Sequence, residues 1–257
     1  MSATSPDTLR LEAESLIVGA ADAGMTVRVA GSMGIAMHCA EASAAMDAAE
    51  RRAKDIDVVV RHGDRARLRA WLEARGWAVD RDMLVAMEGE RFAFRHPETG
   101  LDLDVFVERL QFCHTIELES RWSRHRTTLP IEDLLLQKLQ IHDPKPADAI
   151  DTAIVLATHE VAPGDDAERI DGEYVADVLA RDWGFHRDAT ANLERLAGAA
   201  DGGLPVRVAG AARAREGATR LLAAIAAAKK SRGFRMRARV GERMQWWDDV
   251  DEREDTY

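Results

Sequence analysis

Cysteine and long apolar runs are scarce in this sequence, and each scarcity argues against a class of protein. The 257 residues include two cysteines, Cys39 and Cys113, and neither belongs to a Cys-x-x-Cys pair. A disulfide-stapled secreted scaffold is therefore not expected. The sequence also lacks a secretory signal pattern and an apolar run of about 20 residues, the length that a membrane helix needs. We therefore expect a cytoplasmic protein with no membrane partner.

An excess of positive charge is also missing. Lysine and arginine number 35 against 45 aspartates and glutamates, so the formal net charge is −10. This balance argues against nucleic-acid binding over the whole surface but leaves a local basic patch open. The one basic run spans residues 229–243 and precedes Trp246, Trp247 and an acidic end at 248–255. It is interpreted either as a solvated helix with a self-neutralising terminus or as a surface that stacks on single-stranded RNA.

Hydrophobic residues make up 46% of the chain, which is enough for a substantial core. In the first half, apolar runs and turn residues predict strands at 27–30, 54–60, 83–87, 92–94 and 101–107. An alanine-rich helix to Ala49 is expected after Gly34, with Ser32 as its N-cap, and Asp64 is expected to open another helix that ends at Gly76. The pattern predicts a mixed, largely antiparallel sheet flanked by helices.

The second half is helical in pattern. Helices are expected at 130–141, 146–159, 174–182, 186–197 and 206–230, the last interrupted by Gly210 and Gly217. The predicted fold class is therefore α+β with a C-terminal helical domain, and the predicted domains are residues 1–128 and 129–257.

Two pairs of aspartates stand on predicted strands. Residues i and i+2 of a strand point to the same face, so Asp55 and Asp57 are expected side by side, and Asp102 and Asp104 repeat the arrangement. Neighbouring carboxylates repel one another, and a divalent cation bound by oxygen relieves the repulsion. Of the second pair we choose Asp104 as a metal ligand because it lies deeper in the apolar run, and keep Asp102 in reserve.

Lys138 lies on the apolar stripe of its predicted helix. A lysine in that position must extend to water or find an anion. A phosphate or the carboxylate of Asp151 could serve as that anion. Asp148 is more simply explained as an acid in the first turn of its helix, where it favours the helix dipole.

These residues together resemble the DNA polymerase β-like nucleotidyltransferase superfamily. Gly31-Ser32 after a strand, Asp55-Ile56-Asp57 and Leu103-Asp104-Val105 carry the resemblance over about residues 27–158. The segment 130–139 with Lys138, followed by Asp148 and Asp151, is similar to the AbiEii-type branch, which includes toxins of toxin-antitoxin systems. The interval between Gly31-Ser32 and the Asp pair is longer than in minimal members, which implies an alanine-rich insertion.

The resemblance implies a nucleotidyltransferase fold and transfer of NMP from an NTP to an acceptor hydroxyl. Asp55, Asp57 and Asp104 would hold Mg²⁺, and Gly31 and Ser32 would bind the triphosphate, with Lys138 and Asp151 near the nucleotide. It also implies RNA, tRNA in particular, as acceptor and a cognate antitoxin protein as partner. Two alternatives stay open: a degenerate, non-catalytic module that binds nucleotide or a partner, and a transferase acting on a small-molecule hydroxyl.

Overall fold

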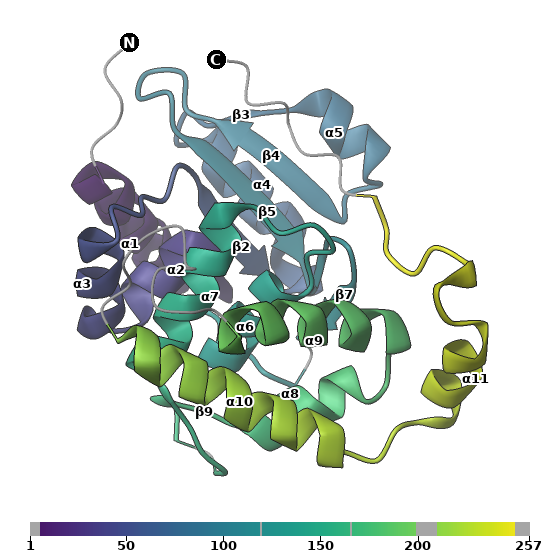
Figure 1. Cartoon of the computed structure of the whole chain (residues 1–257). Coiled ribbons are helices and arrows are strands. Elements are labelled where there is room, and N and C mark those ends of the chain that lie inside the picture. Colours follow the sequence, from purple (N-terminus) through teal and green to yellow (C-terminus); the bar gives the residue numbers. More distant parts are fainter. Residues whose placement is uncertain (1–5, 119, 165, 199–209, 250–257) are drawn as a thin grey trace. The chain divides into compact units, whose positions relative to one another are not determined.

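The computed structural model describes residues 6–118, 120–164, 166–198 and 210–249 (Figure 1). The chain forms two compact units. The N-terminal unit comprises residues 1–110 and 117–134, and the C-terminal unit comprises residues 111–116 and 135–257. The protein is α+β, as predicted, with a mixed sheet in the N-terminal unit and a helical C-terminal unit.

The N-terminal unit is built on a five-stranded sheet with the order β1-β2-β5-β4-β3. The strands are β1 (Val27–Ala30), β2 (Ile56–Val60), β3 (Ala78–Val79), β4 (Arg91–Arg95) and β5 (Asp102–Val107). β2 and β5 are parallel, and the other neighbouring pairs are antiparallel. The prediction of a mixed, largely antiparallel sheet is confirmed.

The two faces of this sheet differ in chemistry because side chains alternate along a strand. On β5, Leu103, Val105 and Val107 belong to the hydrophobic core of the unit, whereas Asp102 and Asp104 point to the other face. The core face packs against α1 (Pro6–Asp22) and α4 (Arg65–Glu73), and α4 is visible behind the sheet in Figure 1. The acidic side chains are thus confined to the face opposite the main core.

The remaining elements of the first 117 residues are short. They are α2 (Gly31–His38), α3 (Ala40–Ala48), the 3-10 turn η1 (His62–Asp64), α5 (Arg81–Ala86), β6 (Arg109–Gln111) and β7 (Thr115–Glu117). α2 and α3 occupy the interval that the sequence assigned to one alanine-rich helix. The helix is interrupted at Cys39, which has extended backbone angles. The Cys39 Sγ atom accepts a hydrogen bond from the Ala42 amide at the start of α3.

Two local predictions were wrong. The segment 83–87, predicted as a strand, lies in helix α5 and the turn after it, because the Asp80 side chain accepts hydrogen bonds from the amides of Asp82 and Met83 and so caps a helix. Ser32, predicted as an N-cap, lies inside the first turn of α2, and the N-cap is Ala30, whose side chain has no polar atom.

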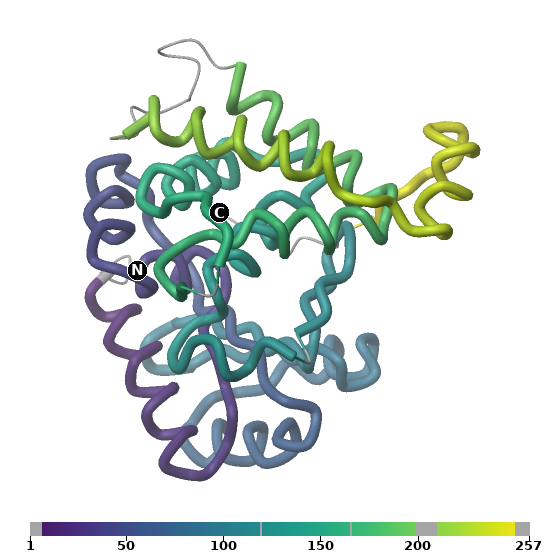
Figure 2. Tube along the Cα trace, turned by 90° about the horizontal axis from the view of Figure 1, so that it is seen from below, coloured from purple at the N-terminus to yellow at the C-terminus, as the bar shows by residue number. Residues whose placement is uncertain are grey.

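The C-terminal part of the chain is mainly helical. Its elements are α6 (Ile131–Leu139), α7 (Pro146–Thr158), β8 (Glu160–Val161), β9 (Arg169–Ile170), α8 (Gly172–Leu179), α9 (Trp183–Ala197), α10 (Ala211–Ala227), α11 (Arg232–Val240) and the 3-10 turn η2 (Gly241–Arg243). α10 packs along α7, α8 and α9, and its course is followed in Figure 2. The first residues of the predicted helix 206–230 lie outside the described residues.

Gly217 does not interrupt α10, contrary to the prediction. It is buried in mid-helix, where a Cβ atom would lie 3.3 Å from the Leu156 Cδ2 atom. A glycine here allows α10 to approach α7 closely, and this contact offsets the modest helix cost of glycine. Among the described residues, no helix is both long and apolar enough to cross a membrane.

His186 of α9 makes the stability of the protein pH-dependent. Burial lowers the pKa of its imidazole to about 4, and the charges of Lys230 and Arg187 act in the same direction. The unfolded chain then binds a proton that the folded chain does not, so stability falls as pH drops from about 6.5 to about 4. We expect His186→Gln to flatten this part of the curve of melting temperature against pH. The exposed His62, replaced as His62→Gln, is the control, and an equal slope in His186→Gln and wild type would contradict the assignment.

Candidate functional site

Gly31 lies directly against Asp57. It follows the last residue of β1, Ala30, which pairs with Asp57 of β2 in the antiparallel ladder. Gly31 has φ of +62°, and a Cβ atom on it would lie 2.0 Å from the Asp57 Oδ2 atom. Glycine is strongly favoured at this position, because a side chain would be strained by the backbone angle and would displace Asp57. The small-residue turn and the acid therefore form one feature.

Asp57 and Asp104 are register partners on the parallel strands β2 and β5. Paired residues in a ladder present their side chains on the same face, so the two carboxylates are neighbours. Gly31, Asp57 and Asp104 thus meet at the central strands of the sheet. Asp102 precedes the ladder between β2 and β5, which begins at the pair of Ile56 and Leu103.

Asp55 is placed differently from the prediction. It lies in a bend before β2, exposed, rather than inside the strand. Because Asp55 lies outside the strand, the alternation of side chains along β2 does not fix the direction of the Asp55 carboxylate, as it does for Asp57. Asp55 is a candidate ligand by its position in the chain next to Asp57.

Arginines accompany the acids on this face. Arg91 of β4 forms an ion pair with Asp104, with 2.7 Å between its Nη2 atom and the Oδ2 atom. Arg95, four residues further along β4, pairs with Asp102 at 3.3 Å. The Arg51 guanidinium donates a hydrogen bond of 2.5 Å to the Ser32 hydroxyl. Cationic groups therefore lie beside both the acids and the glycine-serine turn.

These residues suit a hard cation and a phosphate. Carboxylate oxygens are the protein ligands that Mg²⁺ prefers. The close packing of Gly31 on Asp57 leaves backbone, rather than a side chain, beside the acid, and α2 begins there. The N-terminus of a helix favours an anion. The donor set thus fits the predicted magnesium, although one of its acids is ion-paired to Arg91.

Lys138 and Asp151, both predicted near the nucleotide, meet in the C-terminal unit. The Lys138 Nζ atom lies 3.1 Å from the Asp151 Oδ2 atom and 3.3 Å from the Asp148 Oδ1 atom. The Asp151 side chain has no exposed surface, whereas that of Asp148 is 19% exposed. Asp148 also accepts a hydrogen bond from the Lys145 amide at the start of α7. The anion that the apolar position of Lys138 requires is therefore supplied within the same unit.

Removal of the buried acid of this pair is expected to destabilise the protein strongly. Asp151→Ala removes the fully buried carboxylate beside the Lys138 ammonium and leaves the partly exposed Asp148 next to it. Because breaking a buried pair costs about 3–5 kcal/mol of unfolding free energy, we expect a loss of up to that size. Urea denaturation of the variant measures this loss. Asp143→Ala, at an exposed aspartate in the preceding loop, should change the free energy by less than about 0.5 kcal/mol. Equal effects of the two substitutions would show that the buried pair contributes little.

A polar cluster around Asp188 was not predicted from the sequence. The Asp188 carboxylate lies 2.8 Å from both His114 Nε2 and His142 Nδ1, and it accepts a 3.0 Å hydrogen bond from Trp246 Nε1. Burial raises the pKa of the Asp188 carboxyl, but the hydrogen bonds from His114, His142 and Trp246 outweigh it and lower the pKa below its ordinary value. No local signal could have found this cluster, because its members come from four separate stretches of chain.

The cluster also fixes the aromatic part of the tail. Trp247 stacks on His142 with 3.7 Å between ring centroids, and Trp246 is held by Asp188. These indoles pack within the C-terminal unit, which weakens the interpretation that they stack on RNA bases. Most arginines of α11, by contrast, are exposed. The acidic positions 250–255 lie outside the described residues.

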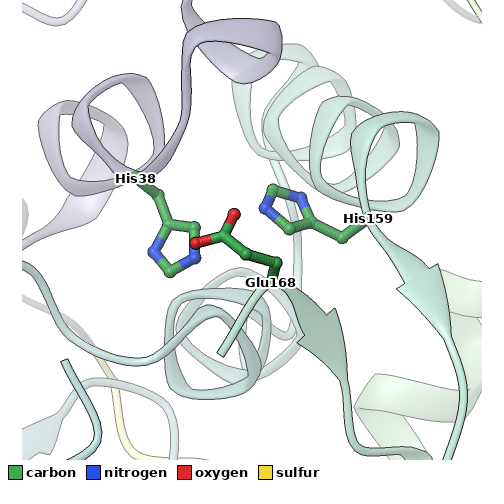
Figure 3. A group of neighbouring side chains, drawn as sticks. All are labelled: His38, His159 and Glu168. Carbon is green, nitrogen blue, oxygen red and sulfur yellow. The ribbon is translucent and has the colours of Figure 1, made fainter. Parts of the chain in front are cut away.

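Figure 3 draws His38, His159 and Glu168. His159 follows α7 and Glu168 precedes β9, and in the C-terminal unit the ligand atoms of these two residues lie within 4.8 Å of each other. His38 ends α2 of the N-terminal unit, where its Nδ1 lies 3.2 Å from the Thr128 hydroxyl. The His159–Glu168 pair offers fewer ligands than the three or four protein ligands of a typical zinc site.

Comparison with known proteins finds no protein-family model, no curated protein and no solved structure that matches this chain. The functional argument therefore depends on the residues themselves.

Proposed function

We propose that this chain is an Mg²⁺-dependent nucleotidyltransferase with the fold of the DNA polymerase β-like superfamily. The observation that carries the proposal is the meeting of Gly31, Asp57 and Asp104. A glycine at a strand end packs against one acid, and that acid pairs in register with a second acid on the neighbouring strand. These three residues would bring a phosphate-binding turn and the oxygen ligands of a metal ion together in one site.

In the proposed reaction an acceptor hydroxyl attacks the α-phosphorus of an NTP. The bond from that phosphorus to the pyrophosphate oxygen breaks, and a nucleotidylated acceptor and pyrophosphate result. The triphosphate lies at the Gly31-Ser32 turn beside Asp57, and Ser32 and the first amides of α2 donate hydrogen bonds to it. Arg51, already bonded to the Ser32 hydroxyl, adds positive charge there.

Asp57 and Asp104, with Asp55 beside them in sequence, would hold the Mg²⁺. The metal, when bound, neutralises negative charge on the phosphates during transfer. Asp104 is also placed to accept the proton of the attacking hydroxyl once its carboxylate is no longer paired with Arg91.

RNA, tRNA in particular, is the proposed acceptor class, and a cognate antitoxin is the proposed partner. Both follow from the resemblance of residues 130–139, Asp148 and Asp151 to the AbiEii-type branch. The exposed arginines of α11 are compatible with a polyanionic acceptor. Transfer to a small-molecule hydroxyl differs in the acceptor alone.

A labelling experiment tests the proposal. Purified protein is incubated with each labelled NTP, Mg²⁺ and total RNA, and label is measured in RNA and in pyrophosphate. Transfer of label to RNA with release of pyrophosphate supports the proposal. No transfer to any acceptor, together with no NTP binding by calorimetry, would refute it.

One observation favours a second candidate, a non-catalytic nucleotide-binding module of the same fold. Arg91 neutralises Asp104 by an ion pair, and an acid held in that way is a poorer metal ligand. Calorimetry distinguishes the two candidates, because saturable NTP binding without turnover supports the module, whereas turnover supports the enzyme.

A further inference from the structure

The ion pair between Arg91 and Asp104 has the geometry of a specific contact. The register partner of Arg91 on β5 is Phe106, and the residue opposite Asp104 is Ala93. The small Ala93 leaves space on this face, and the Arg91 guanidinium lies over the Phe106 ring, 4.8 Å from its centroid, and reaches diagonally to Asp104. The neighbouring strands β4 and β5 can be followed in Figure 1.

The pair is also shielded from solvent. The side chains of Arg91 and Asp104 are 16% and 14% exposed, whereas those of Arg95 and Asp102 are 60% and 37% exposed. Screening by water weakens ion pairs at exposed positions, so the Arg91 pair is the stronger of two otherwise similar pairs on the same two strands.

We infer that Arg91 is the resident counter-ion of Asp104 and competes with a divalent cation for its carboxylate, so that Arg91 sets the metal affinity of the site. This inference rests on the proposed function, in which Asp104 is a metal ligand. A guanidinium 2.7 Å from Oδ2 occupies one of the sites from which a cation would contact this carboxylate. Arg91 is thus a positioning residue, and the metal-bound state requires its guanidinium to turn away.

Titration of the full chain with Mn²⁺ by calorimetry tests the inference, and Mn²⁺ serves as the probe because it accepts the same oxygen ligands as Mg²⁺. We expect Arg91→Met to bind Mn²⁺ about tenfold more tightly than wild type, a change of about 1.4 kcal/mol. Arg91→Gln, which keeps a polar side chain, is a second variant with the same expected direction. The matched control is Arg95→Met, which removes the same charge from the exposed pair and should change the affinity less than about twofold.

A double-mutant cycle separates displacement from a general charge effect. If Arg91 acts through Asp104, Arg91→Met should change Mn²⁺ affinity little in an Asp104→Ala background. Equal affinity of wild type and both Arg91 variants, or equal tightening by Arg91→Met and Arg95→Met, would overturn the inference while leaving the proposed function in place. Failure of wild type and all variants to bind Mn²⁺ would refute the proposed metal site itself.

Discussion

Asp57→Ala is expected to abolish nucleotidyl transfer while leaving the fold intact. Asp57 is the acid at which the candidate site converges, because it contacts the position of Gly31 and pairs in register with Asp104. Loss of a metal ligand removes charge stabilisation of several kcal/mol, and each 1.4 kcal/mol is tenfold in rate. We therefore expect the rate of label transfer to fall by about a thousandfold or more.

The control for this substitution is Asp102→Ala, at the exposed aspartate two residues before Asp104. It removes one carboxylate from the same face of the sheet, but outside the ladder that joins β2 and β5. Its transfer rate should stay within about threefold of wild type, since exposed ion pairs are worth less than about 1 kcal/mol. Unchanged transfer in Asp57→Ala, with a melting temperature equal to that of wild type, would move the active site elsewhere.

Gly31→Ala is expected to reduce both stability and activity. The added methyl group would lie 2.0 Å from the Asp57 Oδ2 atom, far inside van der Waals contact, and the φ of +62° is unfavourable for any residue with a Cβ atom. The left-handed conformation alone costs about 1–2 kcal/mol, and displacement of the Asp57 side chain adds to it. We expect a loss of about 2 kcal/mol or more in the free energy of unfolding. We also expect the rate of label transfer to fall, because the added methyl group displaces the Asp57 side chain from its position in the site.

Gly63→Ala provides the comparison for this variant. A Cβ atom at Gly63 would meet no described atom within 4 Å, so the same chemical change should alter stability by less than about 0.5 kcal/mol. Urea denaturation and the labelling assay measure both variants. Wild-type stability and activity in Gly31→Ala would mean that the turn tolerates a side chain and that close packing on Asp57 is not required.

The alternation of apolar and acidic residues on β5 was readable from the sequence because it is local. Leu103, Val105 and Val107 point one way and Asp104 the other, whatever the partner strands are. The β1 strand and α7 were predictable for the same reason, since their apolar patterns and their flanking turn residues are contiguous. In contrast, the helix at 81–86 was missed although a local signal, the Asp80 cap, was present.

The sequence alone thus determined the fold class, the presence of Asp57 and Asp104 on strands and the need of Lys138 for an anion. Tertiary structure alone decided that Asp57 lies beside Asp104 and that Arg91 forms an ion pair with Asp104. It also decided that His114 and His142 both lie within hydrogen-bond distance of Asp188. Strand register and the packing of distant segments depend on contacts between residues far apart in the chain, and no local pattern encodes such contacts.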